Sequence, residues 1–199
     1  MKIGTQSVTL INPPSYETVL DTIEKCGRVC YRSEQKGEPE RFIRTLIQRG
    51  HESVIEHEGL TFLIKTNRNM THELVRHRIG CSYSQESTRY INYMKDDIEF
   101  IPCFETGDEL YMEEDLEYTE QAYKLMLVNG YAPEVARDIL PGSLATTIAV
   151  TMNFRAIRHF LRLRLDKAAH PQMRELAGLV YDIVKEHYPV FFEDINIEK

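Results

Sequence analysis

The sequence predicts an α+β fold, in which helices wrap a mixed, mainly antiparallel central sheet in a single domain. Stretches with the helical repeat of apolar residues are mixed with stretches of alternating apolar residues, without regular strand–helix alternation. No internal repeat, low-complexity tract or Pro/Gly/Ser linker divides the chain, so residues 1–199 are expected to form one domain. The composition, 42% apolar and 28% charged, is ordinary for a globular protein.

Four stretches of the chain carry strand signals. They are residues 2–12, 59–66, 89–101 and 144–152. In the second of them, Leu60, Phe62 and Ile64 recur at every other position, the period of a half-buried strand. Pro102 ends the third. The Ser- and Gly-rich residues before the third strand are expected to form a loop.

Seven stretches are expected to be helical. They are residues 16–31, 39–49, 71–78, 108–129, 133–140, 153–165 and the segment that Pro171 opens. The first has an apolar stripe at helical spacing, formed by Val19, Ile23, Cys26 and Cys30. Thr71 is the expected N-cap of the third helix, and Asn153 that of the sixth. The fourth should turn its acidic residues to solvent and bury Leu116, Tyr123 and Met126 or Leu127.

The charge and the hydropathy of the chain exclude several classes of protein. The net charge of −7 argues against nonspecific nucleic-acid binding, which needs an excess of Lys and Arg. No apolar stretch reaches the roughly 20 residues that span a bilayer, and the amino terminus lacks the layout of a secretory signal. We therefore expect a cytoplasmic protein with reduced cysteines that binds neither nucleic acid nor a membrane.

The histidine and cysteine spacings do not predict a metal site. Cys26 and Cys30 are not followed by a second pair of ligands at zinc-site spacing. His72 and His77 are five positions apart, which is about 140° around a helix, whereas the zinc-binding His-Glu-x-x-His pattern needs four. A zinc hydrolase is therefore not expected.

The segment RHRIGCSYSQESTRY, residues 76–90, gathers positive charge in this acidic chain. Arg76, Arg78 and Arg89, together with serine hydroxyls and free backbone amides, supply the donors that a phosphate group requires. The segment is therefore a candidate anion-binding site.

A second cationic group lies on the helix expected at residues 153–165. Arg155, Arg158 and Arg162 form a stripe along it, one position from the apolar stripe. Since like charges along a helix repel one another, this array needs anions to meet it. Acidic side chains or a ligand could supply them.

Two side chains of the first segment are candidate nucleophiles. Neighbouring arginines could lower the pKa of the Cys81 thiol, but no residue close in sequence supplies a base for it. Ser87, between Glu86 and Arg89, suits phosphate binding as well as attack. We expect a binding role for Ser87 and no covalent role for Cys81.

Four segments, in order along the chain, resemble the flavin-dependent thymidylate synthase family. The first resembles the family's upstream segment, the second its signature of Arg-His-Arg, eight residues and Ser-Thr-Arg, the third its central segment and the fourth its carboxy-terminal catalytic segment. They are GHESVIEH at 50–57, RHRIGCSYSQESTR at 76–89, ARDILP at 136–141 and NFRAIRHFLRLRLD at 153–166. The gap between the triplet and the serine is one residue longer than in the commonest family form.

The resemblance implies an enzyme that methylates dUMP reductively to dTMP. Its members use FAD as hydride carrier, methylenetetrahydrofolate as carbon donor and NADPH as reductant, without a covalent enzyme nucleophile. They are homotetramers whose active sites are shared between subunits. The expected partners of this chain are therefore dUMP and further copies of itself.

The resemblance also assigns roles to residues by their positions in the matched segments. The residues implied to contact FAD are Ser53, Arg76, His77, Arg78, Gln85, Asn153, Arg155 and His159. The residues implied to bind dUMP are Arg76, Glu86, Ser87, Thr88, Arg89, Arg137 and Arg164. Two of the assigned residues are implied to be catalytic: Arg164, which faces the uracil edge, and His51, near the flavin and the folate.

Two other classes of function fit parts of the sequence. An RNA-binding module would use the arginine groups on phosphates and would need aromatic side chains among them, which Tyr83 and Tyr90 supply in part. The acidic total does not favour it. A helical scaffold without a ligand is the third hypothesis.

Overall fold

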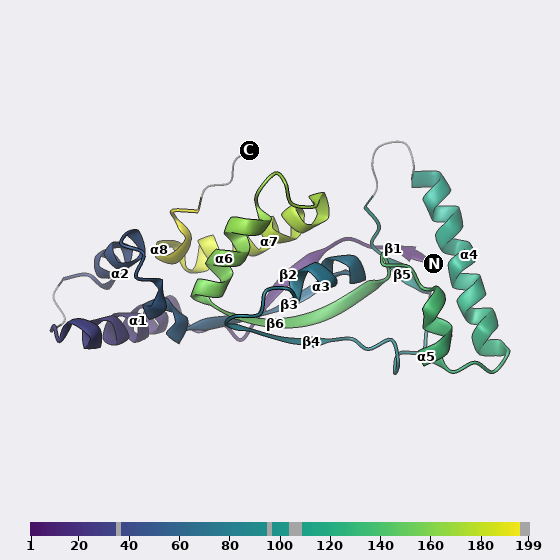
Figure 1. The fold of residues 1–199 in the computed structure, drawn as a ribbon, viewed down its shortest axis with the longest axis horizontal. Helices are drawn as coiled ribbons and strands as arrows, with labels where there is room; N and C mark the ends of the chain where they lie inside the picture. Colours follow the sequence, from purple (N-terminus) through teal and green to yellow (C-terminus); the bar gives the residue numbers. More distant parts are fainter. Residues whose placement is uncertain (35–36, 95–96, 104–108, 196–199) are drawn as a thin grey trace. The chain divides into compact units, whose positions relative to one another are not determined.

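The computed structural model describes residues 1–34, 37–94, 97–103 and 109–195. The α+β class is confirmed, because four strands form an antiparallel sheet in the order β2-β3-β6-β4 and helices make up much of the remainder (Figure 1). Strands β1 and β5 pair separately and in parallel. The strands are β1 Lys2–Ile3, β2 Ser7–Ile11, β3 Gly59–Asn67, β4 Cys81–Gln85, β5 Glu99–Phe100 and β6 Ala145–Asn153.

The α-helices agree with most of the predicted stretches. They are α1 Tyr16–Tyr31, α2 Pro39–Gln48, α3 Arg68–Leu74, α4 Glu109–Val128, α5 Pro133–Ala136, α6 Phe154–Arg164, α7 Pro171–His187 and α8 Pro189–Phe192. Two short 3₁₀ helices are η1 Glu52–His57 and η2 Arg137–Ile139. None of the described helices is both long enough and apolar enough to cross a bilayer.

The chain divides into two compact units. Unit 1 comprises Met1–Ser7, Ile64–Arg76 and Ser84–Ile148, and unit 2 comprises Val8–Leu63, His77–Tyr83 and Ala149–Lys199. The expectation that residues 1–199 form a single domain stays a prediction.

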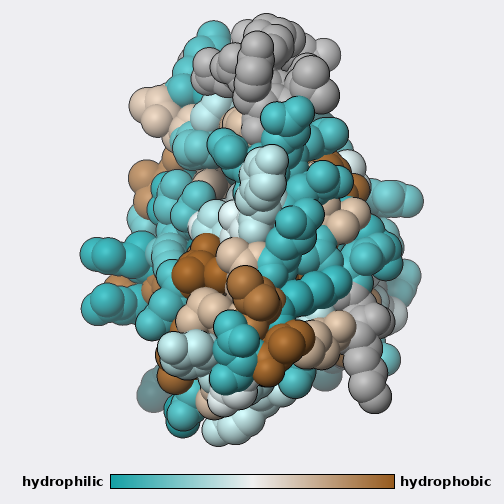
Figure 2. All heavy atoms as spheres, turned by 90° about the vertical axis from the view of Figure 1, so that its right-hand side faces the viewer, coloured by the Kyte–Doolittle hydropathy of each residue, from teal (hydrophilic) through white to brown (hydrophobic). Residues whose placement is uncertain are grey.

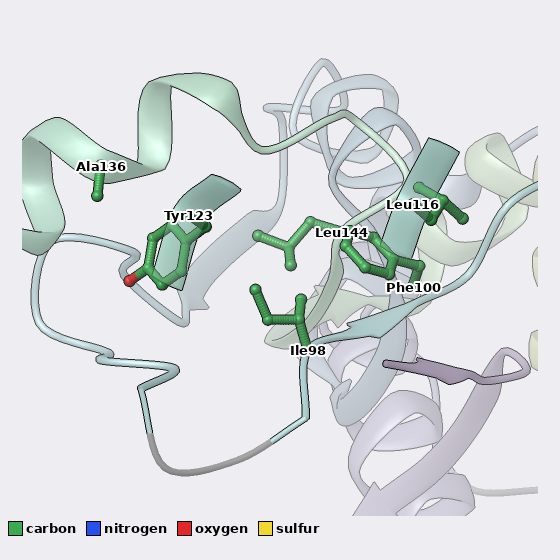
Figure 3. Close-up of a cluster of buried hydrophobic side chains, with 6 residues drawn as sticks. All are labelled: Ile98, Phe100, Leu116, Tyr123, Ala136 and Leu144. Carbon is green, nitrogen blue, oxygen red and sulfur yellow. The ribbon is translucent and has the colours of Figure 1, made fainter. Parts of the chain in front are cut away.

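The core of unit 1 is an apolar cluster to which α4 contributes two side chains. Figure 3 shows its members, which are Ile98, Phe100, Leu116, Tyr123, Ala136 and Leu144. Met126 and Leu127 pack against the cluster, so the inward face predicted for the fourth helix is confirmed. The prediction for its acidic residues is wrong at Glu120, which is buried and accepts a hydrogen bond from the backbone N–H of Ile98.

The core of unit 2 is built from helix faces that the sequence periodicity indicates. Val19 and Ile23 of α1 and Ile157 of α6 are fully buried. The Phe154 ring of α6 lies 5.3 Å from the Tyr188 ring, between their centroids. The Tyr188 hydroxyl donates to the carbonyl of Pro14 at 2.6 Å, which joins the start of α8 to the residues that precede α1.

The predictions for residues 79–101 are partly wrong. Residues 81–85 form strand β4 rather than a loop, and the alternately exposed side chains of this strand include too few apolar residues to signal it. Of the strand predicted at 89–101 only Glu99–Phe100 is extended, because the Ser87 carbonyl accepts from the N–H groups of Tyr90 and Ile91 and turns the chain. Residues 95–96 of that prediction lie outside the described residues.

Other boundaries differ for local reasons. The third helix begins after Asn67, whose side chain caps the N–H of Met70 at 2.9 Å, and Thr71 lies inside it. That helix ends at Leu74, before the Arg-His-Arg triplet. The predicted first strand is interrupted between β1 and β2, and residue 108 of the fourth predicted helix lies outside the described residues.

The apolar stripe predicted for the first helix is wrong at its end. Cys30 is exposed, because the close approach to α2 occurs one turn earlier, at Gly27. A Cβ added to Gly27 would lie 2.8 Å from the Phe42 ring.

Candidate active site

In unit 2, Arg164 and His77 are joined by a hydrogen bond. Nε of Arg164, the last residue of α6, donates to Nε2 of His77 at 3.0 Å. Because that imidazole nitrogen accepts, His77 must be neutral and carry its proton on Nδ1. Burial, the positive charge of Arg164 and the neighbouring His159 lower the pKa of His77 to about 4. The site therefore holds a neutral imidazole against a permanent cation.

The His77 ring is fixed by aromatic neighbours. Its centroid lies 5.2 Å from that of Phe160 and 5.9 Å from that of His159, both edge-on. The Tyr83 hydroxyl donates to the His77 carbonyl at 2.5 Å. The structure thus brings together His77, His159 and Arg164, three residues that the resemblance assigned to the active site.

Asn153 is held by its side chain and its backbone at the start of α6. Its Oδ1 accepts from the N–H of Ala156 at 2.8 Å, which confirms the predicted N-cap. Its backbone N–H donates to the carbonyl of Gly80 at 3.0 Å. Gly80 has φ of +70°, and a Cβ there would lie 2.5 Å from Nδ2 of Asn153. Only glycine fits this close approach.

Acidic side chains of unit 2 meet the cationic stripe of α6. Arg158 is fully buried, and its guanidinium bonds to both carboxylate oxygens of Asp194 at 2.6 Å and to Glu52 at 3.0 Å. Arg162 shares Glu52 at 2.8 Å, and Arg155 pairs with Glu56 at 2.5 Å. Acidic side chains therefore neutralise the stripe.

Arg76 and Arg78 differ from the α6 arginines. Both are exposed, and neither guanidinium has an ion pair or a hydrogen bond within the part of the chain that the structure describes. Since an unpaired guanidinium is free to bind an anion, these two residues are better placed than Arg155 to bind a phosphate group.

His51 and Ser53 lie at η1 of unit 2. Buried Val54 and Ile55 anchor this short helix, which leaves both His51 and Ser53 exposed. Nδ1 of His51 lies 2.8 Å from the hydroxyl oxygen of Tyr31 and their rings stack, so the orientation of the imidazole is defined.

In unit 1, Gln85 and Glu86 are fixed by their neighbours. The side-chain amide of Gln85 donates to the hydroxyls of Thr71 at 3.0 Å and Thr146 at 3.2 Å. Two hydrogen bonds join Glu86 and Thr147. The Glu86 N–H donates to the Thr147 carbonyl, and the Thr147 N–H donates to the Glu86 carboxylate. These contacts hold the end of β4 and the residue after it against Thr71, Thr146 and Thr147.

The remaining residues assigned to the nucleotide also lie in unit 1. Nη1 of Arg137 donates to the Thr88 hydroxyl at 3.3 Å, and Arg89 pairs with Glu134 at 3.6 Å. The Ser87 hydroxyl accepts from the N–H of Arg89 at 3.4 Å. Both partners of the Arg89 pair are more than half exposed, so this pair is weak and easily exchanged for a ligand.

The donors of unit 2 fit a flavin nucleotide. The pyrophosphate of FAD needs cationic or neutral donors, and Arg78, His159 and Ser53 supply them with no ion pair to a carboxylate among the residues that the structure describes. Glu56 competes for Arg155, which is already ion-paired with it. Within the described ranges no cluster of His, Cys, Asp and Glu has the composition of a metal site.

Sequence reasoning missed Gly80, Tyr31 and Tyr83. Gly80 had a signal, because a glycine inside the lengthened gap after the triplet indicates a special backbone conformation. The sequence carries no signal for these contacts of the two tyrosines. Tyr31 bonds to a histidine that is distant along the chain, and Tyr83 bonds to the backbone carbonyl of its histidine.

Several known proteins are similar to this chain. The family model described as thymidylate synthase complementing protein matches residues 15–190. A flavin-dependent thymidylate synthase of Mycobacteroides abscessus is 34% identical over 94% of this chain and 86% of its own. One of Pyrococcus furiosus is 36% identical over 85% of this chain and 75% of its own. A crystal structure of the UMP/dUMP methylase PolB from Streptomyces cacaoi, bound with 5-Br dUMP, superposes with a TM-score of 0.81 at 26% identity over 97% of this chain and 96% of that one.

The fold, the paired arginine and histidine and these matches define an enzyme of the flavoprotein methyltransferase class. The chain belongs to the Thy1 family, the flavin-dependent thymidylate synthases.

Proposed function

We propose that this enzyme methylates dUMP to dTMP, with FAD as hydride carrier, methylenetetrahydrofolate as carbon donor and NADPH as reductant. The observation that carries the proposal is the bond between Arg164, assigned to the nucleotide, and His77, assigned to the flavin. This bond joins a residue proposed for the nucleotide to one proposed for the flavin, and the two ligands must meet in one reaction. The nucleotide analogue in the Streptomyces cacaoi structure supports a pyrimidine nucleotide as substrate.

The proposed flavin residues are those of the resemblance, which are Ser53, Arg76, His77, Arg78, Gln85, Asn153, Arg155 and His159. The unpaired guanidiniums of Arg76 and Arg78 are the strongest of these donors for a pyrophosphate. The proposed nucleotide residues are Arg76, Glu86, Ser87, Thr88, Arg89, Arg137 and Arg164. The contact of Arg137 with Thr88 supports their grouping.

Arg164 is the proposed catalytic cation. C5 of uracil is a poor nucleophile, and a fixed guanidinium beside the ring stabilises the negative charge that develops on it. Because His77 is neutral, it orients Arg164 without competing for that negative charge. When bound, FAD supplies the hydride that completes the methyl group. His51 is the second proposed catalytic residue, held by Tyr31.

The chemistry proposed here needs no enzyme nucleophile. Burial raises the pKa of the Cys81 thiol, an effect that its hydrogen bond with Tyr83 only partly offsets, so little thiolate forms. The Cys81 thiol donates to the carbonyl of Ile79 at 3.5 Å. These contacts support the absence of a covalent role.

We also propose a homotetramer with shared active sites, in the cytoplasm. Figure 2 shows apolar side chains gathered on the face that it presents, and unit 1 exposes Leu125, Val128, Val135 and Ile139. Exposed apolar area of this kind is typical of an interface between subunits. Light scattering during size-exclusion chromatography tests it, and a monomeric mass at micromolar concentration would contradict it.

The decisive experiment is tritium release from dUMP labelled at C5, with and without FAD and NADPH. Purified protein should be yellow or should become so with FAD, and release should need folate, flavin and reductant together. Protein that takes up no FAD, or releases tritium equally without it, overturns the proposal.

A further inference from the structure

A pocket of about 670 Å³ lies between α1 and α2 in unit 2. The two helices lie beside one another (Figure 1), and both contact η1, which carries Ser53. Its volume is in the range that holds a small-molecule ligand. No residue assigned above to the flavin or the nucleotide lines it.

The pocket is cationic although the protein is acidic. Arg28, Arg41 and Arg49 line it, and among the described lining residues Glu38 is the one acidic side chain. Arg28 is already paired with buried Glu24 at 2.9 Å. Neither Arg41 nor Arg49 has an ion pair or a side-chain hydrogen bond to any residue that the structure describes. Two guanidiniums therefore remain available for an anion.

The pocket also offers flat surfaces for an aromatic ligand. The Arg28 guanidinium carbon lies 3.9 Å from the centroid of the Phe42 ring, which makes a planar stack on the wall. Tyr31, half-exposed, forms another part of the wall. A ligand that combines a heterocycle with a phosphate suits these surfaces.

Tyr31 links the pocket to the proposed active site. Its hydroxyl oxygen lies 2.8 Å from Nδ1 of His51, and the centroids of the two rings are 6.5 Å apart. A ligand in the pocket would therefore lie next to the histidine that is proposed to act near the flavin. Among the reactants proposed above, NADPH combines an adenine ring with a dianionic 2′-phosphate.

We propose that this pocket binds the adenosine 2′-phosphate end of NADPH, with Arg41 and Arg49 on the phosphate. The inference rests on the proposed function, because it assigns a place to the reductant of that reaction. The phosphates of dUMP and FAD are assigned above to residues that do not line this pocket. The glutamate tail of a folate is a further anionic group among the proposed reactants, and the experiment below separates it from the 2′-phosphate of NADPH.

The probe is adenosine 2′,5′-bisphosphate, which cannot reduce flavin, titrated calorimetrically into the oxidised, FAD-loaded enzyme. We expect the Arg41→Gln/Arg49→Gln variant to bind it at least about tenfold more weakly, and each single variant to fall between. 5′-AMP, which lacks the 2′-phosphate, should bind the variant and the parent equally. Lys185→Gln, which removes an exposed cation from α7, is the matched control and should bind as the parent does.

Steady-state kinetics gives a second measurement. KM for NADPH should rise about tenfold in the double variant, while KM for NADH, which has no 2′-phosphate, should not change. An unchanged affinity for the bisphosphate overturns the inference. So does a variant that loses affinity for pentaglutamyl folate relative to monoglutamyl folate but keeps the bisphosphate, since the pocket would then hold the folate tail.

The failure of the inference and that of the proposed function are distinguishable. Parent enzyme whose flavin is reduced by dithionite should form dTMP from dUMP and methylenetetrahydrofolate without NADPH. If it forms none, the proposed function fails. The calorimetric titration involves no turnover, so it judges the pocket alone.

Discussion

Nε of Arg164 donates to Nε2 of His77 at 3.0 Å, so a permanent cation is bonded to an imidazole that stays neutral. The two residues lie 87 positions apart in sequence. The charge of the pair therefore stays constant over the physiological pH range, because the pKa of His77 is lowered to about 4.

Stability should fall in acid through His77. Its pKa is about 4 in the folded protein and about 6.5 when unfolded, so between these values the unfolded chain binds more protons. The contribution is complete above pH 6.5, and up to about 3 kcal/mol of unfolding free energy is lost as the pH falls to 4. Urea titrations of the parent and His77→Asn at pH 7, 5.5 and 4.5 measure it. The variant should lose less, and parallel losses would contradict the prediction.

Removing the guanidinium should affect both catalysis and the histidine. We expect Arg164→Gln to lower kcat about 10²- to 10³-fold, the loss typical of a donor that stabilises developing charge. The NMR-measured pKa of His77 should rise, because a positive neighbour is removed. Arg162→Gln on the same helix is the control. A normal kcat in Arg164→Gln would remove the assigned mechanism.

Arg158 and Arg155 of α6 should differ strongly in how much they contribute to the free energy of unfolding. Arg158→Met leaves Asp194 and Glu52 without a buried counter-charge and should cost about 3 kcal/mol of unfolding free energy. Arg155→Met breaks an exposed pair with Glu56 and should cost less than about 1 kcal/mol. Denaturant unfolding of the two variants tests this, and equal costs would be incompatible with the observed difference in burial.

Gly80→Ala should disturb the start of α6. The backbone at this position has a positive φ, which strains an alanine. The added Cβ would also lie 2.5 Å from the Asn153 amide, so the Asn153 side chain that caps α6 must move. We expect a loss of about 1 to 3 kcal/mol in stability and weaker FAD binding. Flavin fluorescence titration and thermal unfolding check both effects. Gly130→Ala, also at positive φ but with open space around it, separates backbone strain from the contact with Asn153.

Cys81 should be unreactive and dispensable. Its raised thiol pKa predicts slow modification by a disulfide reagent at pH 7.5, whereas exposed Cys30 should react fast. Cys81→Ala should keep at least about half of the parent kcat, since no bond to the substrate is lost. Loss of turnover with intact flavin binding would point to a covalent step.

The sequence indicated the helices of this fold better than its strands. The helix faces at Val19, Leu116 and Ile157 follow a repeat of apolar residues, and burial of one face produces that repeat. Strand β4 has no such repeat, because the side chain of Gln85 bonds to Thr71 and Thr146, while Ser82 and Ser84 face solvent. Pairing with distant residues made it a strand, and no local window of sequence contains that information.

The resemblance assigned residues to the candidate site, but nothing in the sequence indicated which of its arginines are paired with a carboxylate. The resemblance assigned Arg155 to the flavin and Arg164 to the nucleotide without distinguishing their surroundings. Arg155 is paired with Glu56, whereas Arg164 bonds to a neutral imidazole. Which arginine meets a carboxylate depends on the packing of η1 against α6, and that packing is set by residues about a hundred positions apart. The sequence alone therefore left the choice between ligand and acidic side chain open.

The bond from Tyr188 to the carbonyl of Pro14 has a consequence for biosynthesis. Pro14 and Tyr188 lie 174 positions apart, so a ribosome must translate that whole stretch before the residues around the start of α1 meet Tyr188. Until then Tyr16, at the start of α1, lacks its Tyr188 neighbour on the nascent chain, and a chaperone can bind the exposed ring during that interval.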